Sequence, residues 1–182
     1  GNSVPRFHLT WGTGPEVVRV FREPLLRAEE KGQVEFHFRH RVDELVVEND
    51  ETGSPRVMGV RGSVLSPTSQ ARGEASPRDV VKHFELRGSA VVIATGGIGG
   101  NLERVRQMWP TERWGECPEE LVTGVPAHVD GRGIDIAQNA GASVVNTDRM
   151  WAYTEGMTNW DPIWPGHGIR IIPGLSLIHI SE

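Results

Sequence analysis

The run VVIATGGIGGN, residues 91 to 101, is the stretch whose residue types point most directly to ligand chemistry. Apolar and small residues lead into Thr95, Gly96 and Gly97, where no large side chain shields the main-chain amides. Glycine allows a positive φ angle and lets a flat or phosphorylated ligand approach the backbone. The run therefore predicts either a nucleotide ligand or simply a tight turn after a strand.

The expected place of this run in a sheet supports the ligand interpretation. We expect residues 89–95 to form a short, buried parallel strand, and open α/β sheets bind their ligands at the carboxyl ends of such strands. The glycines at 96, 97, 99 and 100 do not follow the G-x-G-x-x-G spacing of the dinucleotide fingerprint. The run alone therefore leaves both interpretations open.

The elements that must position this run begin with a helix. Apolar residues recur at helical spacing between residues 14 and 32, with Glu16 near the start and Lys31-Gly32 as a stop signal. Pro24 lies inside this segment and should kink the helix or end its first half, because proline lacks a backbone donor. The alternating residues VEFHF, 34–38, then predict a strand.

An antiparallel meander is expected next. Strand candidates occupy residues 41–48, 56–65 and 79–87, and the turn-rich sequence NDETGSP separates the first two. The polar loop before the third strand is expected to be exposed.

The second half of the chain contains the glycine run and two further helix candidates. A helix or turn is expected over residues 101–109, and a short helix leading into a strand over residues 130–146. From about Met150 the pattern changes, because aromatic residues stand among Gly, Pro, Asn and Asp without a clear period. This change predicts the start of another domain.

Composition excludes several classes of function. The chain has 182 residues and a net charge of -5, which gives no general attraction to nucleic acid. Its single cysteine, Cys117, excludes an internal disulfide and has no neighbours at a metal-ligand spacing, so no metal site is expected. No apolar run approaches the ~18 residues of a membrane span. We expect a cytoplasmic protein that does not bind nucleic acid.

Four stretches together resemble a known family. They are SVPRFHLTWGTGP (3–15), FHFRHRVDELVV (36–47), VVIATGGIGGN (91–101) and DGRGIDIAQNAGA (130–142). Their order is similar to the later part of the flavin domain in the fumarate reductase and 3-ketosteroid dehydrogenase superfamily of FAD-dependent oxidoreductases. The resemblance implies an α/β fold: a partial Rossmann-like FAD-binding domain with an antiparallel β-meander.

The same resemblance implies how the chain is divided. Residues 1–149 would be part of the FAD-binding domain, without the family's Gly-rich phosphate motif, and residues 150–174 would begin a capping or substrate domain. The tail at 175–182 ends in SLIHISE, which resembles a translated sequencing adapter and is expected to be non-native. We therefore expect an internal fragment that binds FAD poorly by itself.

The resemblance also assigns the cofactor site. Val42 would lie beside the adenine of FAD through its backbone, although a plain core position in a strand is equally compatible. Ala94, Thr95, Gly96 and Gly97 would pass along the cofactor. The remaining contacts would come from Asp130, Gly131 and Gly133, although the family often has Gly-Asp-Gly where this chain has Gly131-Arg132-Gly133. Asp130 would then supply the carboxylate.

Candidate catalytic residues follow from the same comparison. Tyr153 falls about where fumarate reductases carry a substrate-binding histidine, and a phenol there would bind a ketone oxygen or take a proton from the carbon next to a carbonyl. Its alternative role is to satisfy a local backbone group. Glu155 is a second polar candidate. Arg6 and His8 match an Arg-x-His found in fumarate reductases, with surface or core roles as the alternative.

The implied function is hydride transfer between flavin and a carbon–carbon bond next to a carbonyl, in a ketosteroid-like or other bulky, hydrophobic ketone. Two alternatives remain. One is a non-catalytic nucleotide-binding domain, and the other is a truncated chain with no independent activity.

Overall fold

The computed structural model describes residues 14–71, 74–150, 156–163 and 167–171. The chain divides into two compact units, Gly1–Phe38 and Arg39–Glu182. Each unit is described by itself. The division of the chain into domains at residue 149 stays a prediction.

The first unit contains the predicted helix, α1 (Gly14–Glu30). Glu16 in its first turn and Arg27 in its last turn both suit the helix dipole. Pro24 lies inside α1, which continues to Glu30. Of the two expected effects, the end of the helix at Pro24 is wrong, and the kink stays a prediction. The strand predicted at 34–38 is wrong, because these residues pair with no other strand in the described part of the chain and a strand needs such a partner.

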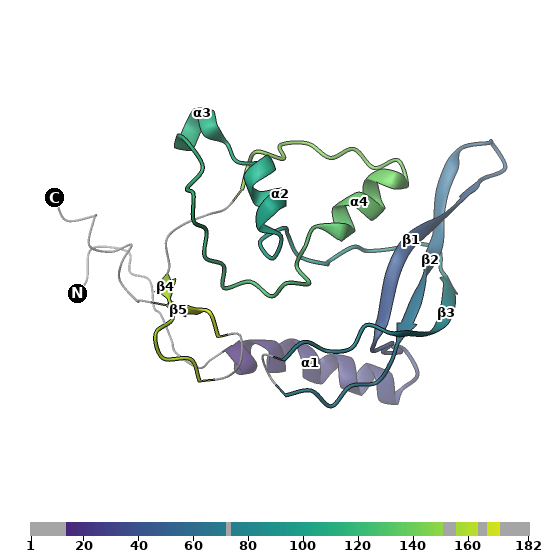
Figure 1. The fold of residues 1–182 in the computed structure, drawn as a ribbon. Coiled ribbons are helices and arrows are strands. Elements are labelled where there is room, and N and C mark those ends of the chain that lie inside the picture. The colour runs from purple at the N-terminus through teal and green to yellow at the C-terminus, as the bar shows by residue number, and fades with distance from the viewer. Residues whose placement is uncertain (1–13, 72–73, 151–155, 164–166, 172–182) are drawn as a thin grey trace, which may run out of the picture. The chain divides into compact units, whose positions relative to one another are not determined.

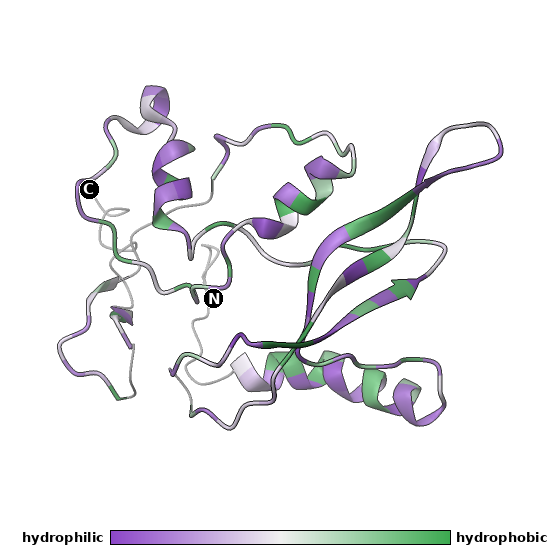
Figure 2. Ribbon diagram, turned by 45° about the vertical axis from the view of Figure 1, so that its right-hand side comes forward, coloured by the Kyte–Doolittle hydropathy of each residue, from purple (hydrophilic) through white to green (hydrophobic). Residues whose placement is uncertain are grey.

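The second unit is built on the predicted meander (Figure 1). Its strands are β1 (His40–Asn49), β2 (Pro55–Leu65) and β3 (Val80–Arg87), which form an antiparallel sheet in the order β1-β2-β3. Hydrophilic and hydrophobic residues are interspersed along these strands (Figure 2). The meander is confirmed.

A β-bulge interrupts β1 close to its start. Val42 pairs with Gly62 and Glu44 pairs with Arg61, so Asp43 is the extra residue between two paired positions. Gly62 makes room for this bulge, because a Cβ atom there would lie 2.0 Å from the carbonyl oxygen of Arg41. A bulge changes the direction in which a side chain points. The residue affected here is Asp43.

Short helices follow the sheet. They are α2 (Leu102–Gln107), α3 (Thr111–Trp114) and α4 (Arg132–Asn139). The first and last match predicted helices, whereas no helix is predicted from the sequence at α3. Two short strands, β4 (Gly156–Thr158) and β5 (Ile169–Ile171), form a separate antiparallel pair.

The buried strand predicted at 89–95 is wrong in this structure, as is the strand predicted at the end of 130–146. Within the described ranges neither segment pairs with another strand, and Val92 is 90% exposed. A parallel strand depends on neighbours that are distant in sequence, which its own residues do not provide. The described residues thus form a mixed helix and antiparallel-sheet fold, and a Rossmann-like parallel sheet stays a proposal.

The core of this unit is small. Among the described residues the buried hydrophobic side chains are Val46 and Leu65, and Ser63 is a buried polar residue that is 3% exposed. All three lie in β1 or β2. The sheet is therefore the best-packed part of the unit and the element from which the site is built.

Candidate functional site

The glycine run exposes its backbone, as the sequence predicts. Ala94, Thr95, Gly96 and Gly97 are all exposed. Gly96 has a φ angle of 78°, which few other residues adopt. A Cβ atom added at Gly97 would meet nothing within 4 Å. Open space therefore adjoins the main chain at the point where the sequence predicts a ligand.

The first turn of α4 packs directly against Thr95. A Cβ atom at Gly133 would lie 2.0 Å from the Oγ1 atom of Thr95, so only glycine fits there without movement. Gly131, with a φ angle of 87°, turns the chain into the helix. The Oδ1 atom of Asp130 accepts a hydrogen bond from the backbone N–H of Arg132 at 3.0 Å. Asp130 thus holds this turn, and the structure brings four of the predicted cofactor residues together.

An open hollow of about 320 Å³ lies between the glycine run and α4. Its wall is mostly apolar, which suits a flat ring more than a charged group. The residues that line it are Ile93, Ala94, Thr95, Gly96, Gly133, Ile134, Ala137, Ala142, Ser143 and Val144. The hollow and the bare backbone beside it have the features of a site for part of a nucleotide.

Arg104 links α2 to α4 by hydrogen bonds. Asn101 caps α2 by accepting a hydrogen bond from the backbone N–H of Arg104. The guanidinium group of Arg104 donates to both carboxylate oxygens of Asp135 at 2.8 Å, and also to the carbonyl oxygen of Gly131 at 3.3 Å. Arg104 lowers the pKa of Asp135 through these hydrogen bonds. These hydrogen bonds join the helix that follows the glycine run to α4.

Asp43 connects the same helix to the sheet. Its Oδ1 atom accepts hydrogen bonds from Arg132 Nη2 and Arg41 Nε, both at 2.7 Å, and its Oδ2 atom accepts one from Ser63 Oγ at 2.8 Å. Burial disfavours the ionised carboxylate, but the hydrogen bonds from Arg41, Arg132 and Ser63 outweigh it and lower the pKa of Asp43 to about 2. The carboxylate therefore stays charged at neutral pH.

Val42 lies next to this link. It is half-buried and pairs with Gly62 in the sheet. The backbone of Val42 and the turn before α4 are thus joined through Asp43 and Arg132, and α4 in turn contacts Thr95. A contact between Val42 and adenine stays a prediction.

Sequence reasoning missed Arg104 and Asp43. The two pairs that they form join residues 31 and 89 positions apart in the chain, a separation at which no local pattern reports a contact. The only available signal for Asp43 was its place next to Val42.

The predicted catalytic residues lie outside the described residues. They are Arg6, His8, Tyr153 and Glu155. Their roles therefore stay predictions.

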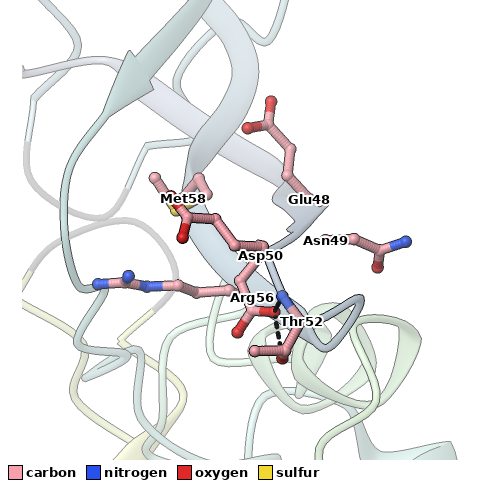
Figure 3. Close-up of a pocket in the computed structure, with 7 residues that line it drawn as sticks. Glu48, Asn49, Asp50, Thr52, Arg56 and Met58 are labelled. Atoms are coloured by element: carbon pink, nitrogen blue, oxygen red, sulfur yellow. Dashed lines mark hydrogen bonds between the residues drawn. The ribbon is translucent and has the colours of Figure 1, made fainter.

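A second hollow, of about 470 Å³, lies at the turn between β1 and β2 (Figure 3). Its polar side chains build the turn: Asp50 Oδ1 accepts hydrogen bonds from the N–H of Thr52, the hydroxyl of Thr52 and the N–H of Ser54. We do not assign a ligand to this hollow, because its central carboxylate already serves the backbone.

The described residues contain no group of His, Cys, Asp and Glu side chains arranged to hold a metal ion. None of the described helices is both long enough and apolar enough to cross a membrane.

Comparison with known proteins identifies the family. The model of the FAD binding domain matches residues 1–181, almost the whole chain. The chain belongs to the FAD binding domain family. FAD is the cofactor that this membership indicates, which confirms the cofactor predicted from the sequence.

The chain is also similar to two mycobacterial proteins. It is 59% identical over 181 residues to a KsdD-like steroid dehydrogenase of Mycolicibacterium smegmatis and 58% identical over 181 residues to one of Mycobacterium tuberculosis. These matches cover 100% of this chain but only 31% and 30% of the relatives. The chain therefore spans about 30% of the length of these relatives. No solved structure matches it.

The residues present fit part of an FAD molecule. Gly97 leaves its surroundings open, and the absence of a side chain at Gly133 lets α4 pack closely on Thr95 beside the hollow. In the described part of the chain, no group accepts a hydrogen bond from the main-chain N–H of Thr95, Gly96 or Gly97. These donors suit the oxygen atoms of a phosphate or a ribose.

Proposed function

We propose that the whole protein is an FAD-dependent dehydrogenase that transfers hydride between flavin and a carbon–carbon bond next to a carbonyl. The proposed substrate is a ketosteroid or another bulky, hydrophobic ketone. Membership of the FAD binding domain family supports the cofactor, and the names of the two relatives support the substrate class. A Rossmann-like parallel sheet and a capping domain that begins near residue 150 complete the proposed architecture.

The observation that carries the proposal is the uncovered main chain of Thr95, Gly96 and Gly97 against the first turn of α4. In this proposal the amides of these residues donate to the cofactor. The backbone of Val42 lies beside the adenine. Asp130 holds the turn at Gly131 by accepting a hydrogen bond from the backbone N–H of Arg132.

FAD, when bound, supplies the hydride acceptor or donor. The protein must then hold the ketone and move one proton. We assign the proton transfer to Tyr153, which as a phenolate would take a proton from the carbon next to the carbonyl, or as a phenol would donate a hydrogen bond to the ketone oxygen. Glu155, Arg6 and His8 are proposed as further polar groups at the substrate entrance.

One alternative is favoured by a specific observation. Among the described residues the buried hydrophobic side chains are Val46 and Leu65, while Val92 and Ile93 remain 90% and 42% exposed. So small a core gives little stability. The 182-residue chain alone is therefore proposed to have no independent activity, and the dehydrogenase function belongs to the whole protein.

The test is to purify the whole protein and record its visible spectrum, in which flavin absorption bands are expected. Anaerobic addition of a 3-ketosteroid should then bleach these bands, and a small dicarboxylate should not. A colourless protein that binds ADP would instead support a non-catalytic nucleotide-binding domain. A yellow protein reduced by the dicarboxylate alone would contradict the substrate class.

A further inference from the structure

The ion pair between Asp43 and Arg132 is the one link in the described residues that joins β1 to α4 by charge. Asp43 occupies the β-bulge between Val42 and Glu44, and its carboxylate lies 2.7 Å from Arg132 Nη2. Arg132 is the first residue of α4, between Gly131 and Gly133. The pair therefore connects the strand of Val42 to the turn that contacts Thr95.

Several features show that the sheet is shaped around this carboxylate. Ser63 is only 3% exposed, and its buried hydroxyl is satisfied because it donates a hydrogen bond to Asp43. Arg41 donates to the same carboxylate from the same strand. Gly62 allows the close approach of Arg41 that the bulge requires. The carboxylate that binds Arg132 is therefore also held by two residues of the sheet, Arg41 and Ser63.

We propose that Asp43 and Arg132 are positioning residues that set the spacing between the backbone of Val42 and the exposed main chain of Thr95 to Gly97. The steps are all local contacts: Val42 adjoins Asp43, Asp43 binds Arg132, and Gly133 packs on Thr95. The inference rests on the proposed function, in which both backbone segments lie along one FAD molecule. A ligand that touches both segments depends on their spacing, because fixed binding groups lose less freedom on association.

The geometry of the pair determines the choice of variants. Arg132 reaches Asp43 through a single nitrogen atom, so a lysine ammonium group can replace it as a point charge. Arg132→Gln removes the charge, and Arg132→Lys keeps it. Asp43→Asn removes the opposite charge. Arg61→Gln is the matched control, because Arg61 forms ion pairs with Glu44 and Glu85 in the same sheet and none with α4.

The experiment measures the Kd of FAD by flavin fluorescence in the whole apoprotein, together with the thermal midpoint of each variant. Arg132→Gln and Asp43→Asn should each weaken FAD binding about fivefold, as expected for the loss of one partly exposed ion pair. The double variant should bind FAD no more weakly than whichever single variant has the higher Kd. Arg132→Lys should stay within about twofold of the wild type, as should Arg61→Gln.

Three results would overturn the inference. One is an unchanged Kd in Arg132→Gln with only a lower thermal midpoint, because the pair would then act on stability alone. Another is a double variant whose loss is the product of the two single losses, because the residues would then act independently. The third is wild-type protein that binds no FAD, which overturns the proposed function as well and is recognised before any variant is measured.

Discussion

Arg104 and Asp135 form a two-point contact in which both carboxylate oxygens lie 2.8 Å from the guanidinium nitrogens. The side chain of Arg104 is only 14% exposed, and it also donates to the carbonyl oxygen of Gly131. Because α2 follows the glycine run directly and Asp135 lies in α4, this one side chain joins the two segments that border the hollow. The arrangement has consequences for stability and for cofactor binding.

Replacing Arg104 by lysine should destabilise the protein although the charge is kept. Lysine offers a point charge and cannot form the two parallel hydrogen bonds of a guanidinium group. We expect the free energy of unfolding to fall by about 1 to 2 kcal/mol, measured by urea denaturation of the whole apoprotein. Glu103→Gln on the same helix is the control and should change it by less than about 0.5 kcal/mol. An equal change in the free energy of unfolding in the two variants would show that the two-point contact between Arg104 and Asp135 contributes nothing to stability.

Gly133→Ala should disturb the contact between α4 and the glycine run. The new Cβ atom would lie 2.0 Å from Thr95 Oγ1 and 3.2 Å from Thr95 Cβ, so one of the two segments must move. We expect a loss of stability of about 1 to 3 kcal/mol and weaker FAD binding, measured by denaturation and by flavin fluorescence. The double variant Gly133→Ala with Thr95→Ala should recover part of the stability, because it removes the nearer atom. No recovery would place the clash elsewhere.

Gly97→Ala should have the opposite pattern. A Cβ atom at Gly97 meets nothing within 4 Å of the protein itself, so the apoprotein should be as stable as the wild type. The methyl group would instead project into the space proposed for the cofactor. We expect the Kd of FAD to rise about tenfold, which corresponds to about 1.4 kcal/mol. Unchanged FAD binding in this variant would remove Gly97 from the cofactor path.

The sequence predicts the meander and the short helices because their signals are local. Alternation over 41–48 and 56–65, with NDETGSP between them, is enough for a hairpin, and apolar spacing after Gly133 is enough for α4. Alternation also predicts a strand at 34–38, and a short run of apolar and small residues predicts one at 89–95, yet the described residues give neither a partner. Strand pairing is decided between distant segments, so an isolated pattern cannot establish it.

In the candidate site, too, features that depend on local residue types can be predicted, and features that depend on pairing between distant segments cannot. Exposure of Thr95 to Gly97 follows from residue type, and the structure confirms it. The bulge at Asp43 depends on how β1 pairs with β2, because it exists only where Val42 and Glu44 face consecutive residues of the neighbouring strand. No periodicity in β1 alone indicates that register. The hydrogen bonds of Asp43 with Ser63 and Arg132 therefore follow only from the folded structure.

Asp43 should give the protein a dependence of stability on acid pH. Its pKa is lowered to about 2 in the folded protein, below the ordinary value of 3.8 for an aspartate. A group with a depressed folded pKa stabilises the protein above its unfolded pKa, and that contribution is lost as the pH falls through the folded value. Between about pH 4 and pH 2 the wild type should therefore lose more stability than Asp43→Asn, measured by urea denaturation at each pH. Parallel curves for the two proteins would contradict this role.

Tyr153→Phe should separate chemistry from cofactor binding in the whole protein. Tyr153 is the one tyrosine of the chain, and the variant removes only its hydroxyl. If that hydroxyl moves a proton, reduction of the flavin by a 3-ketosteroid should slow about 10²- to 10⁴-fold, the usual range for a general acid or base. FAD retention should change far less, because binding is assigned to the backbone of Thr95 to Gly97. Stopped-flow absorbance measures the first quantity and fluorescence the second. Reduction at the wild-type rate would exclude Tyr153 from proton transfer, and a parallel loss of FAD would assign it to binding instead.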